Sequence, residues 1–177
     1  MEATTQLNEK QRVAVTYQWL IIGLGSALFL SQIPRMPVER IDFRFLLIAA
    51  MTLIVSSRVA VKIPRFNVSV TISDTFIFLA ILLYGGEAAV LLAVADGLIT
   101  GARAGRKVRT ILFSAAVMAC STSLSVLALT LLAGPAMQLV RQPSAVLAVG
   151  ISAMALAQYL ANTGLVALGM SFKHAQP

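Results

Sequence analysis

Long apolar runs separated by short charged segments dominate this sequence of 177 residues. The runs cover residues 15–33, 43–61, 73–101, 110–133 and 144–172. Runs of about 20 apolar residues match the hydrocarbon thickness of a bilayer. In a bilayer every backbone polar group needs an internal partner, which leaves helices or closed barrels. Barrel strands alternate apolar and polar residues, and these runs do not. The sequence therefore predicts an all-α integral membrane protein with a single helical domain over residues 1–177.

The composition supports this prediction. Hydrophobic residues make up 58% of the chain and charged residues 12%, whereas roughly a quarter of a soluble domain is charged. The net charge of +7 does not predict nucleic-acid binding, because the basic residues lie between the apolar runs. Membrane proteins keep Lys and Arg there, near the cytoplasm and anionic lipid heads. The lipid bilayer is therefore the expected partner.

The number of spans depends on residues 73–101. A single helix kinked at Gly85 and Gly86 gives five spans, with six basic residues on one side and eight on the other. Two helices joined by a turn at these glycines give six spans, with ten basic residues on one side and four on the other. Adjacent glycines favour a turn, and an excess of Lys and Arg is typical of the cytoplasmic side. The sequence therefore favours about six transmembrane helices with both termini cytoplasmic, and five is the alternative. The ten cytoplasmic basic residues would be Lys10, Arg12, Arg58, Lys62, Arg65, Arg103, Arg106, Lys107, Arg109 and Lys173.

Two acidic residues inside these apolar stretches are candidates for a polar site. A charged side chain at membrane depth costs roughly 3 kcal/mol or more and usually faces protein or water. Asp96 either contacts a ligand, an ion or another helix inside the bundle, or pairs with Arg103 or a neighbouring basic residue. Asp74 either joins such a site or, like Ser73, caps the start of a helix.

Polar residues in the later runs have similar alternatives. Gln158 and Asn162, one helical turn apart, either line a polar cavity or form hydrogen bonds between helices. Ser114, Ser121 and Ser125 share one helical face among small Ala residues, a pattern that indicates close helix packing.

A basic stretch follows the second apolar run. Arg58, Lys62 and Arg65 would share one face if the helix continued through them, with their heads reaching toward lipid. The alternative is that Arg58 pairs with Asp74 or Asp96 across the bundle.

No catalytic constellation is visible in the sequence. The single His, His174, lies near the end of the chain, and the lone Cys120 lies inside an apolar run. The sequence has no metal-ligand cluster, phosphate-binding loop or nucleophile beside a base. We therefore expect no catalytic residue, metal or cofactor, and no enzymatic activity of this chain itself.

The middle third of the chain carries a recurrent pattern. It comprises an Ile-Pro segment, a Ser-Asp-x-Phe-x-Phe start, a Gly-containing turn, an Asp-Gly-Leu, a basic loop and a Leu-Phe. The matching positions are Ile63, Pro64, Ser73, Asp74, Phe76, Phe78, Tyr84, Gly85, Gly86, Asp96, Gly97, Leu98, the loop 103–109, Leu112 and Phe113. In this pattern the region resembles the multi-pass N-terminal membrane region of bacterial signalling proteins. It departs from that family at Gly86, which replaces a proline, and at Ser114, which replaces an asparagine.

The resemblance implies a sensory or input module in the bacterial inner (cytoplasmic) membrane. In that family the module precedes a cytoplasmic GGDEF diguanylate cyclase, HD phosphohydrolase or histidine kinase domain, so the chain would be the N-terminal part of a longer protein or act on a cytoplasmic partner. The same stretch is similar, more loosely, to the substrate-binding S components of energy-coupling-factor vitamin transporters, which are six-helix bundles. A structural membrane protein without a ligand is the third alternative.

Overall fold

Six α-helices make up most of the described chain in a computed structural model of the protein. The described backbone covers residues 2–36, 42–58, 61–62, 69–70, 73–104, 107–135 and 143–174, and the described side chains cover 12–36, 42–54, 73–103, 107–135 and 143–171. The elements are α1 (Glu2–Gln32), η1 (Ile33–Arg35), α2 (Phe43–Arg58), β1 (Val61–Lys62), β2 (Ser69–Val70), α3 (Ser73–Tyr84), α4 (Gly86–Ala104), α5 (Val108–Ala133) and α6 (Ser144–His174). The predicted all-α fold with six helices is confirmed.

Three regions of the described chain are long and apolar enough to cross a bilayer, judged by length and composition. They are Arg12–Arg35, Val108–Ala133 and Ser144–Ser171. The apolar helices Phe43–Ile54 and Ser73–Tyr84 are shorter. Membrane crossing by all six helices therefore stays a prediction, as does the side on which each end lies.

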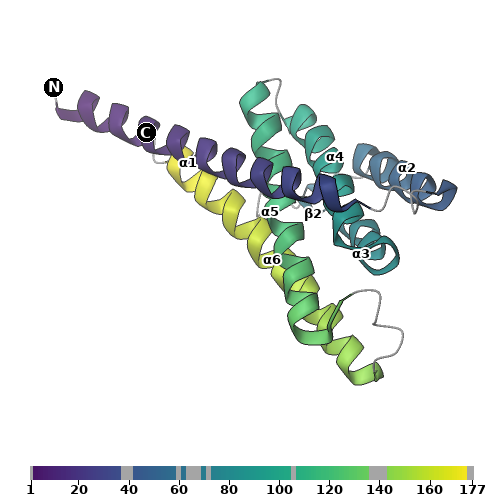
Figure 1. The fold of residues 1–177 in the computed structure, drawn as a ribbon. Coiled ribbons are helices and arrows are strands. Elements are labelled where there is room, and N and C mark those ends of the chain that lie inside the picture. The colour runs from purple at the N-terminus through teal and green to yellow at the C-terminus, as the bar shows by residue number, and fades with distance from the viewer. Residues whose placement is uncertain are drawn as a thin grey trace.

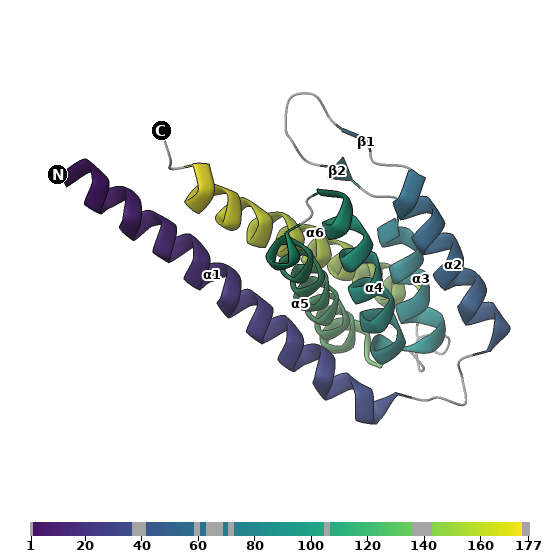
Figure 2. The same cartoon turned by 90° about the horizontal axis from the view of Figure 1, so that it is seen from above.

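Helix α5 is the central element and packs against α1, α4 and α6. Helices α2 and α3 pack against α4 and against each other. Figures 1 and 2 show α1 and α6 projecting away from α2, α3 and α4, with the start of α1 and the end of α6 on the same side. The largest apolar cluster lies between α2, α3, α4, α5 and α6, and includes Ile77, Ile81 and Met154.

Glycines allow two helices to lie directly against α5. A Cβ atom on Gly97 would lie 2.7 Å from the Ala115 Cα, and one on Gly101 would lie 2.8 Å from the backbone of α5. On α1, a Cβ on Gly25 would lie 2.6 Å from the Ala116 Cα. Small residues let helix backbones approach closely, which is a main source of helix association in lipid. The central position of α5 therefore depends on glycine in the helices that pack on it.

Helix α2 ends earlier than the sequence predicted. It ends at Arg58 rather than at residue 61, and β1 follows and pairs antiparallel with β2. Both strands contain a β-branched valine, Val61 and Val70, which suits a strand. The helix does not continue through Lys62, which lies in a strand, so the condition for Arg58, Lys62 and Arg65 to share one helical face is not met. Arg65 itself lies outside the described residues.

Candidate functional site

Helices α3 and α4 form an antiparallel hairpin around Gly85. Helix α3 ends at Tyr84 and α4 begins at Gly86. Gly85 has a φ of +95°, a conformation that glycine adopts without the steric cost met by other residues. Near the open end of the hairpin, Ser73 Oγ donates a hydrogen bond of 3.1 Å to Asp96 Oδ2. The turn therefore brings the first residue of α3 beside the second half of α4.

Asp96 lies in the interior of the bundle. Its side chain is 2% exposed and Ser73 is fully buried, whereas Arg103, further along α4, is exposed. A carboxylate that leaves water needs polar partners to offset its lost hydration, and the Ser73 hydroxyl is one such partner. Asp96 is therefore a residue of the helix interfaces and not of the protein surface.

A second polar link joins the hairpin to α5 and α6. Gln158 of α6 is 2% exposed and donates from Nε2 to Asp74 Oδ1 over a long distance of 3.4 Å. Its Oε1 accepts a hydrogen bond of 2.9 Å from Ser125 Oγ of α5. Ser125 Oγ also lies 2.9 Å from the carbonyl oxygen of Ser121, one turn earlier in α5. A single amide side chain therefore connects three helices.

We call Ser73, Asp74, Asp96, Ser125 and Gln158 the polar cluster. Four helices contribute to it, and the adjacent residues Ser73 and Asp74 bring its two links together at the start of α3. The cluster offers carboxylate, amide and hydroxyl groups, which can exchange protons or hold helices in register. The described side chains contain no group of three or more His, Cys, Asp or Glu residues that could hold a metal ion.

Asn162 of α6 and the described basic residues around the connection from α4 to α5 occupy other positions along the helices. Asn162 is half-buried, one turn beyond Gln158, and takes no part in the hydrogen bonds of the polar cluster. Arg103, Lys107 and Arg109 are exposed where α4 is followed by α5. Arg106 lies outside the described residues, as do the side chains of Arg58 and Lys62.

At the closed end of the hairpin, Asp42 ties the start of α2 to the end of α3. Its Oδ1 accepts a hydrogen bond of 3.0 Å from the Phe45 backbone N–H and another of 3.0 Å from the Tyr84 hydroxyl. The Phe45 N–H, with help from the Tyr84 hydroxyl and the Arg44 charge, holds the pKa of Asp42 below its usual range. An Asp just before an apolar run is a helix N-cap signal, so the first bond could have been predicted. The bond from the Tyr84 hydroxyl joins residues 42 positions apart, and no sequence pattern near either residue predicts it.

Sequence reasoning missed two further contacts of the helix interfaces. Gly97 and Gly101 have the small-xxx-small spacing typical of close helix pairs, so their role could have been predicted. The Tyr17 hydroxyl of α1 donates a hydrogen bond of 3.0 Å to the Leu165 carbonyl oxygen of α6, and the Tyr17 and Phe113 ring centroids are 6.2 Å apart. That bond joins distant segments and leaves no local signal.

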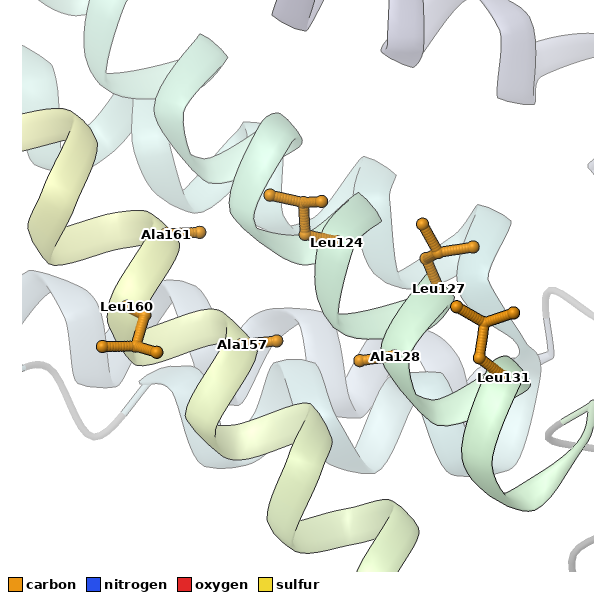
Figure 3. Close-up of a pocket in the computed structure, with 7 residues that line it drawn as sticks. All are labelled: Leu124, Leu127, Ala128, Leu131, Ala157, Leu160 and Ala161. Atoms are coloured by element: carbon orange, nitrogen blue, oxygen red, sulfur yellow. The ribbon is translucent and has the colours of Figure 1, made fainter.

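An open groove of about 490 Å³ runs along the seam between α5 and α6 (Figure 3). Its lining consists only of Leu and Ala side chains. They are Leu124, Leu127, Ala128, Leu131, Ala157, Leu160 and Ala161. Ala157 and Leu124 are the chain neighbours of Gln158 and Ser125. The groove therefore follows the same seam as the buried amide link.

Comparison of the chain with known protein families, curated proteins and solved structures finds no match. The structure itself defines a class, an all-helical bundle whose apolar helices enclose a buried polar cluster. The resemblances drawn from the sequence stay predictions.

Proposed function

We propose that this chain is a multi-pass membrane protein that acts as a sensory or input module. Its surface and interior support a lipid environment. Large apolar side chains are highly exposed, among them Phe43 at 77%, Leu131 at 75% and Leu20 at 66%. The buried residues include Asp96 and Gln158 at 2% each. An apolar exterior around a polar interior suits a protein whose surroundings are hydrocarbon.

The proposed topology places the start of α1 and the end of α6 in the cytoplasm. Phe113, near the start of α5, contacts Tyr17, near the start of the apolar span Arg12–Arg35 that α1 contributes, and lies close to Gly169 near the end of α6. The exposed Lys107 and Arg109 lie near the same end of α5. Basic residues at the end where α1 begins and α6 ends support the cytoplasmic assignment.

The hydrogen-bond chain through Gln158 is the observation that supports an input role most directly. Gln158 belongs to α6, the helix that leads to the C-terminal end, and its amide links α6 to Asp74 of the hairpin and to Ser125 of α5. A ligand or a change in the bilayer that moves the hairpin would therefore displace α6. The expected readout is a cytoplasmic effector on the same chain or on a partner, as in the signalling proteins that the sequence resembles.

A chimera tests this role. The full chain is fused after Pro177 to a diguanylate cyclase catalytic domain and expressed in bacteria, and cyclic di-GMP is measured. Asp74→Asn weakens the bond to Gln158 and should change the output at equal protein level. Thr130→Ala is the matched control, because the exposed Thr130 bonds only its own helix, at the Val126 carbonyl. Equal output from both variants and the parent chain would contradict the input role.

Topology has its own test. Compartment reporters inserted at Gly86 and at Lys107 should report opposite sides of the membrane, with Lys107 in the cytoplasm. If both reporters lie on the same side, α4 does not cross the bilayer. The hairpin of α3 and α4 would then not be a pair of transmembrane helices.

The S component of a vitamin transporter is a second candidate, supported by the six-helix count. It predicts tight binding of a vitamin by the purified chain and copurification with an ATPase pair. Calorimetry that detects no vitamin binding would count against this candidate and leave the input role unaffected.

A further inference from the structure

Ser125 has one hydroxyl hydrogen and two acceptors at the same distance. The Ser121 carbonyl and Gln158 Oε1 each lie 2.9 Å from Ser125 Oγ. A serine hydroxyl can donate only once but can also accept. Ser125 is fully buried and Gln158 is 2% exposed. Ser125 can therefore change from donor to acceptor toward Gln158 without losing a partner, because the Ser121 carbonyl takes its hydrogen.

Gln158 can make the complementary change. A primary amide has an oxygen that accepts and a nitrogen that donates, and a half-turn about its last bond exchanges them. In the structure the nitrogen faces Asp74 and the oxygen faces Ser125, which suits an ionised Asp74. After a half-turn the oxygen faces Asp74 and the nitrogen donates to Ser125. That arrangement needs a hydrogen on Asp74, since two bare oxygens would repel.

We infer that Asp74 is a proton-binding site, and that Gln158 and Ser125 form a relay that keeps every partner satisfied in both protonation states. This inference rests on the proposed function and names a proton as the input. A hydronium ion in the water beside Asp74 gives up one proton: its O–H bond breaks and leaves a water molecule, an O–H bond forms at Asp74 Oδ1, and no further covalent bond changes. Asp74 then donates to Gln158 Oε1, Gln158 Nε2 donates to Ser125 Oγ, and Ser125 donates to the Ser121 carbonyl.

Protonation would also move α6. The present contact between Gln158 Nε2 and Asp74 Oδ1 is 3.4 Å long, whereas the most common distance of an O–H···O hydrogen bond is about 2.7 Å, about 0.7 Å less. A protonated Asp74 therefore draws Gln158, and with it α6, toward the start of α3. Asp74 is half-buried, so water can deliver the proton at the end of the helix.

The charged neighbours of Asp74 enter the same equilibrium. From α4, Asp96 is hydrogen-bonded to Ser73, the chain neighbour of Asp74. On α2 the described charged side chain is Arg44, which lies beside Asp42 near the other end of α3. From α5 and α6 the groups that reach Asp74, directly or through the relay, are Ser125 and Gln158. Asp96 is therefore the described titratable group whose variant must be compared.

Infrared difference spectra of the full chain in lipid nanodiscs, recorded between high and low pH, test the inference. A carboxylic acid C=O band should rise at low pH, be lost in Asp74→Asn and persist in Asp96→Asn. The side-chain carbonyl band of Gln158, identified by its loss in Gln158→Leu, should shift with the same pH midpoint. If Asp74→Asn gives too little folded protein, Asp74→Glu should move the acid band in frequency instead of removing it.

Two results would overturn the inference. A band that survives Asp74→Asn and disappears in Asp96→Asn assigns the proton to Asp96. An Asp74 band that titrates while the Gln158 carbonyl does not shift removes the relay. The input role fails separately, because it is judged by cyclic di-GMP from the chimera: unchanged output with a titrating Asp74 refutes the role alone, and changed output without an Asp74 band refutes the proton site alone.

Discussion

Replacing Gly97 of α4 with alanine tests whether direct contact with α5 holds the bundle together. The new Cβ would lie 2.7 Å from the Ala115 Cα and 2.9 Å from the Ser114 carbonyl oxygen. Both are backbone atoms, so neither can rotate away as a side chain would. The helices would have to separate by about 0.8 Å to restore an ordinary carbon–carbon contact.

Two opposing terms set the size of the effect. Overpacking of a close interface costs about 1–3 kcal/mol, and the higher helix propensity of alanine returns up to about 1 kcal/mol. Helices α4 and α5 share the most extensive contact between described elements, so their separation also loosens the buried side chains near Gly97. We expect Gly97→Ala to lower the free energy of unfolding by about 1–2 kcal/mol, and Gly97→Leu to lower it further.

Gly23 provides a control in which the change in the free energy of unfolding should have the opposite sign. A Cβ on Gly23 of α1 would meet nothing within 4 Å, so Gly23→Ala should gain up to about 1 kcal/mol from helix propensity alone. Both variants and the parent protein are purified in the same detergent, and their unfolding is followed by thermal and denaturant titration. If Gly97→Ala is as stable as Gly23→Ala, close glycine packing does not determine how α4 sits on α5.

Three other substitutions test single contacts, again by unfolding in detergent. Tyr17→Phe removes the bond to the α6 carbonyl and should cost about 0.5–1.5 kcal/mol, whereas Tyr159→Phe, on a side chain that is 59% exposed, should cost nothing measurable. Ser73→Ala removes a donor from the buried Asp96 and should cost about 1–3 kcal/mol; an unchanged midpoint would show that this bond adds no stability. Because the pKa of Asp42 is lowered in the folded state, its ionised form stabilises the protein above the ordinary carboxyl pKa, and this contribution is lost as pH falls through the folded-state pKa. Asp42→Asn should therefore have a flatter stability profile in that acidic range, and parallel profiles would contradict the assignment.

The helices could be predicted because their signal is local. Each apolar run contains its own helix, and the glycine pair with the count of basic residues favoured the turn at Gly85 that the structure contains. The predicted end of α2 was wrong because the residues from Arg58 to Lys62 look locally like a continuation of the helix. The pairing of β1 with β2 is a contact between separate segments, which a local pattern does not show. Tertiary pairing of this kind outweighs a weak local preference.

The members of the polar cluster were easier to predict than their partners. Asp74, Asp96 and Gln158 stand out because polar groups are rare in apolar runs. The sequence does not show which of them pair, because Gln158 and Asp74 are 84 positions apart and no periodic pattern connects them. Ser125 was interpreted as a packing residue, and its burial agrees with that, but its bond to Gln158 depends on how α6 lies against α5.

That dependence suggests why an amide occupies position 158. The seam between α5 and α6 consists largely of Ala and Leu, and similar apolar faces can pack in more than one register. The two observed bonds of Gln158, to Asp74 and Ser125, belong to one of these registers, and in another register the buried Gln158 amide would lose both partners at a cost of about 1–3 kcal/mol. A leucine at this position would keep the apolar contact but remove that penalty. Gln158 therefore fixes the register of α6 by the same two bonds that would carry a proton signal to it, so a change at Asp74 acts on the contact that positions the helix.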